Sequence, residues 1–224
     1  MELLLDTANL EDIADGLETF AVSGVTTNPT ILKAEGKVPF FDHLCRIRKL
    51  IGDTRSLHVQ VVGNSCEEMV KEAGKIRSEV GKQTYIKVPV TSEGLKAIQI
   101  LAPEGVNVTA TAIYSTFQGM MASISGAKYL AVYYNRMKNI DVDPDRAIND
   151  ISKVLPSDGS CSILAASFHN IAQVTSAYAA GARACTVGYK LLAGGLCMPS
   201  VQKAAEDFHK DWVAVYGNRS MTDM

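Results

Sequence analysis

Short apolar runs and longer amphipathic stretches alternate along the whole chain. The apolar runs are rich in Val, Ile, Leu, Tyr and Thr and are bounded by turn residues, which is typical of buried β-strands. They predict strands at residues 3–6, 24–27, 57–62, 85–88, 106–111, 129–133, 162–167 and 184–188. Several stretches between them repeat apolar residues with helical spacing. These predict helices at residues 66–80, 91–101, 117–125, 145–155 and 171–180.

This alternation predicts an α/β fold with a parallel sheet and right-handed crossovers. An open, doubly wound sheet has the same alternation, but eight units in 224 residues fit a closed (β/α)8 TIM barrel better. Residues 200–216 form a further helical pattern with no strand after it. We expect this extra C-terminal helix to pack under its own barrel or on a neighbouring subunit. No linker or repeat interrupts the chain, so residues 1–224 are predicted to form one domain.

Composition and charge narrow the function classes. The net charge is −2 and the pI about 6.1, which makes nucleic acid an unfavourable partner. The apolar run at the N-terminus is only three residues long, too short for a signal peptide or a membrane span. The five cysteines have no CxxC spacing. We therefore expect reduced thiols in the cytoplasm, with no disulfide framework and no zinc site.

Polar residues stand near the ends of most predicted strands. A TIM barrel has its active site at the carboxyl ends of its strands, and side chains two residues apart share a face. Both faces of a parallel sheet are covered, so polar side chains there are better explained by a shared barrel mouth than by solvent exposure. The residues concerned are Asp6, Thr26, Asn28, Gln60, Lys87, Asn107, Thr109, Thr111, Tyr133, Arg136 and Ser167.

Lys87 is the central candidate. It lies within an apolar strand, between Ile86 and Val88. Burial of a lysine favours its neutral amine, which is a nucleophile. A neutral amine attacks a ketone to give an iminium, and the iminium then accepts electrons from the adjacent carbon–carbon bond. The alternative is a lysine on an edge strand that extends its amine into solvent.

Imine chemistry needs a positioned acid or base close to the lysine. Tyr133, at the mouth end of the sixth predicted strand, is the candidate, although a lone tyrosine is more often a packing residue. Its neighbour Tyr134 faces the opposite side and is assigned to packing. Gln60 and Thr111 are expected to hold the water or substrate hydroxyl through which the proton moves.

The remaining mouth residues are expected to bind substrate. Asp6 and Asn28 suit sugar hydroxyls, although a solvated carboxylate and a turn-stabilising asparagine are the alternatives. Arg136 and Ser167 together suit a phosphate, although a surface salt bridge is the alternative for Arg136. Thr26 and Thr109 are further candidates for substrate binding.

No metal or cofactor signature is present. His58 is interpreted as a hydrogen-bonded core histidine, deeper in the barrel than Gln60. The other histidines have no metal-ligand spacing, and no GxGxxG or Walker motif occurs.

Several of these segments together resemble the small-subunit transaldolase family. They are residues 5–9 (LDTAN), 24–30 (GVTTNPT), 87–95 (KVPVTSEGL), 111–114 (TAIY), 135–136 (NR) and 164–168 (LAASF), in family order over nearly the whole chain. The resemblance implies a TIM barrel, a Schiff-base lysine at Lys87, and no metal or organic cofactor. It also implies rings of subunits, pentamers or decamers, in which the C-terminal helix packs on a neighbour.

Two branches of the family differ in their acid/base residues. Transaldolases usually carry Glu on the third strand and Phe on the sixth, whereas the fructose-6-phosphate aldolase branch carries Gln and Tyr. Gln60 and Tyr133 therefore resemble the aldolase branch. His58 and the bulky segment 115–117, which ends in Phe117, depart from that branch and leave donor and acceptor preference open.

The sequence accordingly predicts a class I aldolase that joins dihydroxyacetone, or a similar hydroxyketone, to glyceraldehyde 3-phosphate. A transaldolase that transfers dihydroxyacetone between sugar phosphates is the first alternative. A non-catalytic barrel that binds sugar phosphates is the second, because a fold alone does not guarantee an activity.

Overall fold

The computed structural model describes residues 1–224, which divide into two compact units, Met1–Leu191 and Leu192–Met224. The first unit contains all the strands, and the second contains the C-terminal helix. The predicted candidate site residues all belong to the first unit.

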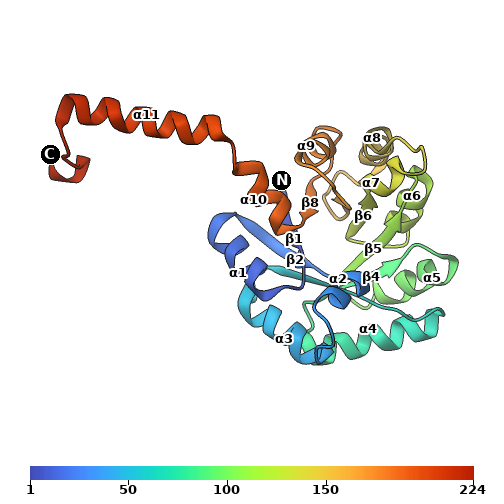
Figure 1. Cartoon of the computed structure of the whole chain (residues 1–224). Helices are drawn as coiled ribbons and strands as arrows, with labels where there is room; N and C mark the ends of the chain where they lie inside the picture. The colour runs from blue at the N-terminus through green and yellow to red at the C-terminus, as the bar shows by residue number, and fades with distance from the viewer. The chain divides into compact units, whose positions relative to one another are not determined.

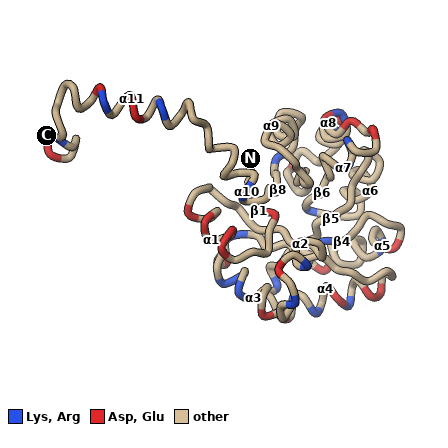
Figure 2. Tube along the Cα trace, in the orientation of Figure 1, with Lys and Arg blue, Asp and Glu red and all other residues tan.

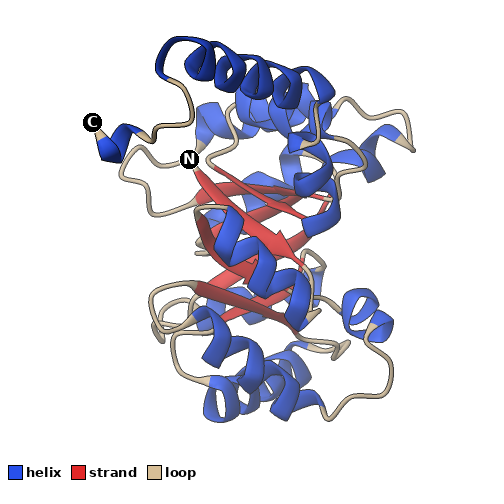
Figure 3. Ribbon diagram, turned by 60° about the vertical axis from the view of Figure 1, so that its left-hand side comes forward, coloured by secondary structure: helices blue, strands red, loops and turns tan.

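Eight parallel strands close into a barrel in chain order, so that β1 pairs with both β2 and β8. This closure excludes the open sheet and confirms the predicted (β/α)8 TIM barrel. In Figure 3 the strands occupy the centre and helices enclose them. The strands are β1 (Glu2–Asp6), β2 (Val22–Thr26), β3 (Ser56–Gln60), β4 (Tyr85–Pro89), β5 (Val108–Ile113), β6 (Tyr129–Tyr133), β7 (Ser162–Ala166) and β8 (Ala184–Val187).

Helices follow the strands and lie outside the barrel (Figure 1). Those between strands are α1 (Leu10–Thr19), α2 (Pro29–Ala34), α3 (Phe40–Ile51), α4 (Cys66–Val80), α5 (Ser92–Leu101), α6 (Thr116–Ile124), α7 (Tyr134–Lys138), α8 (Pro144–Val154) and α9 (Ile171–Ala179). After β8 come α10 (Tyr189–Leu196), α11 (Pro199–Tyr216) and a 3-10 turn, Met221–Asp223.

The clearest helix signal is also the most accurate prediction. Helix α4 has the predicted bounds because Ser65 and Glu68 form a capping box at its start and Gly81, with φ of 125°, ends it. The sequence interpretation did not identify α1, α2, α3, α7 or α10. Of these, α2 has six residues and α7 has five, and both are too short to show a periodicity.

The predicted fifth strand is wrong in its bounds. Strand β5 begins at Val108, so Asn107 precedes it and does not belong to the mouth set. Its side chain accepts a hydrogen bond from Lys128 Nζ (2.7 Å) and donates one to Gln83 O (3.2 Å). At its far end β5 contains an irregularity around Ala112, whose φ is 60°, next to Thr111. Such bulges re-aim neighbouring side chains and are frequent beside active sites.

A closed polar and aromatic network fills the barrel near the amino ends of the strands. We call it the lower layer: Glu2, Ser56, His58, Tyr85 and Tyr129. The fully buried His58 bonds Ser56 Oγ through Nε2 (2.9 Å) and stacks on Tyr85 with ring centroids 4.5 Å apart. The Tyr129 hydroxyl donates to Glu2 Oε2 (2.6 Å).

His58 therefore is the hydrogen-bonded core histidine that the sequence predicts. Its other nitrogen, Nδ1, bonds Thr109 Oγ1 at 2.8 Å, so both ring nitrogens have partners. Burial lowers the pKa of His58 well below its ordinary value of 6.5, and the positive charges of Lys87 and Arg48 lower that pKa further. The imidazole is consequently neutral.

The C-terminal unit consists mainly of α11, which carries an apolar stripe. Val201, Phe208 and Val215 are spaced seven residues apart and are 60%, 72% and 70% exposed. Seven-residue spacing puts all three on one side of the helix. Trp212 Nε1 donates to Arg219 O (2.8 Å), which ties the C-terminal turn to α11.

Charges are distributed without a dominant sign. Figure 2 shows acidic and basic residues interspersed along outer helices such as α3 and α4. No helix combines the length and apolar character that crossing a membrane requires.

Candidate active site

A polar cavity of about 300 Å³ lies at the carboxyl ends of the strands. It brings together residues from six strands, or from the segments that directly follow them, that are far apart in sequence, as a barrel mouth requires. Six predicted site residues line it: Asp6, Asn28, Lys87, Tyr133, Arg136 and Ser167. The other lining residues are Thr30, Ile31, Ala166, Phe168, His169, Thr186 and Gly188.

Lys87 reaches this cavity from the middle of β4. Its side chain is only 4% exposed, and Nζ donates a hydrogen bond to Thr27 O at 2.8 Å. Burial lowers the pKa of Lys87 below its ordinary 10.5, while the negative charge of Asp6 acts in the opposite direction. Because the barrel has no edge strand, Lys87 is not the solvent-extended lysine of the alternative interpretation.

Asp6 is held by a chain of two hydroxyls. Thr26 Oγ1 donates its only proton to Asp6 Oδ1 (2.6 Å). Thr186 Oγ1, which lies 2.6 Å from Thr26 Oγ1, is therefore the donor in that second hydrogen bond. Burial raises the pKa of Asp6, and the Lys87 charge and the Thr26 hydrogen bond oppose that rise. Thr26 itself is fully buried and does not line the cavity. The structure places Thr26 behind Asp6, and its predicted contact with substrate stays a prediction.

Tyr133 and Thr111 form the second polar pair of the mouth. Their hydroxyl oxygens are 2.9 Å apart, and Thr111 is fully buried. Burial raises the pKa of Tyr133 above its ordinary 10.0, so the phenol keeps its proton at neutral pH. The Tyr133 ring also packs edge-on against Tyr114 with centroids 5.5 Å apart.

Thr109 was expected beside Thr111 in the mouth. It is fully buried, bonds His58 Nδ1 (2.8 Å) and does not line the cavity. Substrate binding by Thr109, like that by Thr26, stays a prediction, although neither residue lines the cavity. In a closed barrel, residues two apart on one strand share a face but lie at different depths.

Asn28 caps a helix and also lines the cavity. Its Oδ1 accepts from Ile31 N (2.9 Å) and so caps α2, as a turn-stabilising asparagine does. Its side chain still lines the polar cavity. The cap uses only the side-chain oxygen, so the amide Nδ2 keeps its capacity to donate hydrogen bonds.

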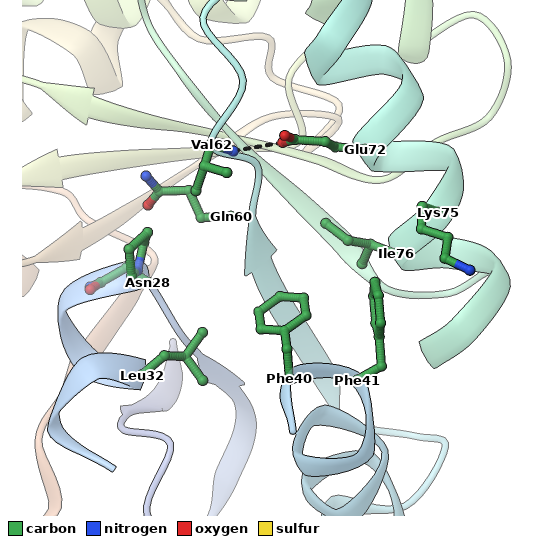
Figure 4. Close-up of a pocket in the computed structure, with 10 residues that line it drawn as sticks. Asn28, Leu32, Phe40, Phe41, Gln60, Val62, Glu72, Lys75 and Ile76 are labelled. Atoms are coloured by element: carbon green, nitrogen blue, oxygen red, sulfur yellow. Dashed lines mark hydrogen bonds between the residues drawn. The ribbon is translucent and has the colours of Figure 1, made fainter. Parts of the chain in front are cut away.

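Gln60 lies on a second, apolar cavity of about 430 Å³, formed between α2, α3 and α4. Asn28 lines both cavities. Figure 4 shows the amides of Gln60 and Asn28 on one side of the apolar cavity, opposite Phe41 and Ile76. Gln60 Oε1 is buried and accepts no hydrogen bond from the protein, which is uncommon for a buried amide.

Arg136, on α7, and Ser167, just after β7, both line the cavity. The salt bridges of the structure do not include Arg136, so the alternative interpretation of this residue does not apply. The Arg136 guanidinium lies 4.7 Å from the centroid of the Tyr133 ring, and its Nη1 is 3.4 Å from Tyr114 OH. Its charge thus stays available to an anion in the cavity.

Comparisons with known proteins agree with this geometry. The family model "Transaldolase/Fructose-6-phosphate aldolase" matches residues 3–219. The chain is 47% identical to a probable fructose-6-phosphate aldolase of Streptococcus pneumoniae (strain ATCC 700669 / Spain 23F-1), over 99% of this chain and all of that protein.

The chain belongs to the transaldolase/fructose-6-phosphate aldolase family.

Two solved structures share the fold at low sequence identity. Thiamine phosphate pyrophosphorylase of Pyrococcus furiosus gives a TM-score of 0.63 at 15% identity, over 96% of this chain and 97% of that one. A cube-shaped protein cage designed by fusing symmetric oligomeric domains gives 0.60 at 13% identity, over 96% and 78%. At such identities these likenesses concern the barrel alone.

Sequence reasoning missed several residues of this family member's site. Thr186 lines the cavity and orients Thr26, but a threonine in an apolar strand has no distinctive pattern. His169 lines the cavity beside Ser167 and was noted only as a histidine outside any metal spacing. Asn135 and Gln173 are buried polar residues that bond each other behind the lining, and a contact between distant residues leaves no signal in one sequence.

Proposed function

We propose that this family member is a class I aldolase in which Lys87 forms a Schiff base with a hydroxyketone. The observation that carries the proposal is a lysine amine, 4% exposed, in the lining of a polar cavity at the barrel mouth. The name of the Streptococcus relative, a probable fructose-6-phosphate aldolase, supports the same reaction class.

In the proposed reaction Lys87 Nζ attacks C2 of fructose 6-phosphate and, with loss of water, gives an iminium. The hydroxyl proton on C4 leaves to a base in the cavity, the C3–C4 bond breaks, and its electrons reach the iminium nitrogen to form an enamine. Glyceraldehyde 3-phosphate departs. Protonation of the enamine carbon and addition of water then release dihydroxyacetone and Lys87. Because the iminium nitrogen is the electron sink, we propose that the reaction uses no metal or organic cofactor.

The proton transfers are assigned to Tyr133 together with Thr111. Their hydroxyls are 2.9 Å apart, within the range for direct proton exchange, and the raised pKa of Tyr133 keeps a proton on the phenol. Gln60, with its unpartnered Oε1, would position the water that protonates and hydrolyses the enamine. Asp6, close enough to Lys87 to influence its pKa, would bind the substrate hydroxyls and accept the C4 proton.

Substrate contacts are divided between the two sides of the cavity. Asn28 Nδ2 would hold a donor hydroxyl, and Arg136 with Ser167 would hold the phosphate of glyceraldehyde 3-phosphate. An exposed guanidinium without a carboxylate partner, next to a serine hydroxyl, is suited to a phosphate dianion.

Transfer of dihydroxyacetone to a second sugar phosphate is the alternative activity, since the family model covers both reactions. A site that protonates the enamine readily releases the ketone, whereas one that holds the enamine passes it to another aldehyde. Tyr133 with Gln60 supports the first outcome. Replacing both, Gln60→Glu with Tyr133→Phe, should raise the ratio of transfer to cleavage, and an unchanged ratio would contradict the assignment.

Two measurements test the proposal. Incubation with dihydroxyacetone and borohydride should add one reduced ketone to the mass of the protein at Lys87, whereas a non-catalytic binding barrel gains no mass. A product assay on fructose 6-phosphate should yield free dihydroxyacetone without erythrose 4-phosphate. If glyceraldehyde 3-phosphate is released only when erythrose 4-phosphate is added, and no free dihydroxyacetone appears, the chain is a transaldolase.

We further propose that the enzyme assembles into a ring, a pentamer or decamer, through α11. The stripe of Val201, Phe208 and Val215 is too apolar for a helix that stays in water, and an 18-residue helix gains most of its stability from packing. Native mass spectrometry of the full chain and of Phe208→Asp tests this, with loss of the ring expected for the variant.

Five free cysteines support a reducing, cytoplasmic location.

A further inference from the structure

The two segments that carry the proposed phosphate site are joined by a buried side chain that does not itself line the cavity. Arg136 belongs to the short helix α7, and Ser167 belongs to the turn between β7 and α9. Gln173, on the first turn of α9, lies behind both and is only 8% exposed.

Gln173 closes a circuit of three hydrogen bonds. The backbone N of His169 donates to Gln173 Oε1 (2.7 Å), and Gln173 Nε2 donates to Asn135 Oδ1 (2.9 Å). The backbone N of Asn135 in turn donates to Ser167 O (2.9 Å). The circuit therefore links the Ser167–His169 turn to α7 at the residue immediately before Arg136.

Both ends of this circuit need external support. Ser167 has a φ of 64°, in the left-handed region that non-glycine residues rarely adopt, so the turn must be held by its surroundings. Helix α7 has five residues, too few to be stable by itself. Arg136 has no ion pair, and its guanidinium is held only by Tyr114 OH and the Tyr133 ring, so a shift of α7 would move it.

We propose that Gln173 is a positioning residue that sets the spacing of Arg136 and Ser167, and so governs recognition of a phosphorylated substrate. The inference rests on the proposed function, in which these two residues bind the phosphate. Gln173 touches neither the reacting carbons nor Lys87, so its loss should weaken phosphate binding and leave the carbon–carbon chemistry in place.

The test compares aldol addition of dihydroxyacetone to glyceraldehyde 3-phosphate and to glyceraldehyde. Gln173→Met keeps the length and volume of the side chain and removes both hydrogen bonds. We expect it to raise KM for glyceraldehyde 3-phosphate by about tenfold, the scale of one weakened charged contact, with kcat little changed. The kcat/KM for glyceraldehyde should stay within about twofold of the parent value, because no phosphate contact is made.

Ser176→Ala is the matched control. Ser176 lies one turn further along α9 and donates to the Asp145 carboxylate (2.9 Å), a contact outside the circuit. It should leave the ratio between the two aldehydes unchanged. A Gln173→Met enzyme that loses activity equally on both aldehydes would contradict the inference, because that pattern indicates a general structural role.

A double variant distinguishes action through Arg136 from any other route. If Gln173 acts by placing Arg136, then Gln173→Met should have almost no further effect on KM in an Arg136→Met background. Additive effects would overturn the inference. Asn135→Ala breaks the same circuit from the other side and replaces Gln173→Met should that variant fail to fold.

The two proposals fail in different ways. If Arg136→Met leaves the preference for the phosphorylated aldehyde intact, the phosphate site itself is wrong. If Arg136→Met removes that preference but Gln173→Met and Asn135→Ala do not, only the positioning role of Gln173 is wrong. Borohydride trapping at Lys87 should persist in all of these variants.

Discussion

The barrel contains two polar layers, and they differ in whether their hydrogen bonds close within the protein. In the lower layer, His58 has a partner on each ring nitrogen and Tyr129 is bonded to Glu2. In the mouth layer, which we define as Asp6, Lys87, Thr111 and Tyr133, Thr111 is buried behind Tyr133 and the other three residues line the cavity. The groups of this layer influence one another's pKa. A polar residue inside a barrel is thus evidence of a site only where its hydrogen-bonding capacity faces open space.

This difference predicts opposite consequences of substitution. Removing a polar group from the mouth layer should reduce activity much more than stability, although buried partners such as Thr26 and the Thr27 carbonyl lose a hydrogen bond there. Removing one from the lower layer should reduce stability and leave turnover per folded molecule nearly intact, because it strands a buried partner.

The largest expected effect is that of Lys87→Met. The substitution removes the proposed nucleophile, so cleavage of fructose 6-phosphate should fall by a factor on the order of 10⁴ or more, and borohydride should add no mass. The thermal midpoint should stay the same or rise, because a buried amine is replaced by an apolar side chain of similar length. Circular dichroism melting measures this. If Lys87→Met clearly lowered the thermal midpoint, the two layers would not differ in their effect on stability, and the comparison would be wrong.

Tyr133→Phe should have the next largest effect. Loss of a positioned proton donor typically costs about 10²- to 10⁴-fold in rate, and the enamine should persist longer. Borohydride trapping should therefore still label Lys87, while steady-state release of dihydroxyacetone falls. An unchanged rate of release would assign the proton transfers to another group. Tyr129→Phe, in the lower layer, is the control tyrosine and should keep its activity.

Ser56→Ala sharpens the comparison from the lower layer. It leaves His58 Nε2 without its partner at full burial, which should cost about 1–3 kcal/mol. For a chain of this size that corresponds to a fall in melting temperature of roughly 2–4 °C per kcal/mol. The kcat at a temperature where the variant is folded should match the parent. A fall in kcat without a fall in stability would place His58 in the catalytic machinery.

The smallest expected effect is a pair of opposite shifts in pH dependence. Trapping needs the neutral amine, so it should increase as pH rises through the lowered pKa of Lys87. The Asp6 charge raises that pKa and the Arg136 charge lowers it. Asp6→Asn should therefore move the midpoint of trapping to lower pH, and Arg136→Met should move it to higher pH. Shifts in the same direction would contradict the proposed electrostatic balance.

Local signals in the chain predicted much of the barrel. Helix α4 followed from its capping box and β6 from its apolar run, and both have the predicted bounds. The bounds of β5 could not be predicted, because the strand contains a bulge at Ala112 and no residue type in the sequence indicates it. The site residues at strand ends were predictable because alternation and parallel pairing bring those ends together. That Thr26 and Thr109 lie outside the cavity lining could not be predicted, because depth in a barrel depends on strand tilt and register.

By itself the sequence determined that eight strands recur along the chain with helices between most of them, that Lys87 lies within an apolar strand, and that the net charge is small. Only the tertiary structure decided which polar groups face the cavity and which are closed off. It alone brought Gln173 to Asn135 and left Arg136 without an ion pair. The reason is physical: periodicity and capping act between neighbours in the chain, whereas burial and hydrogen-bond partners arise only when distant segments pack.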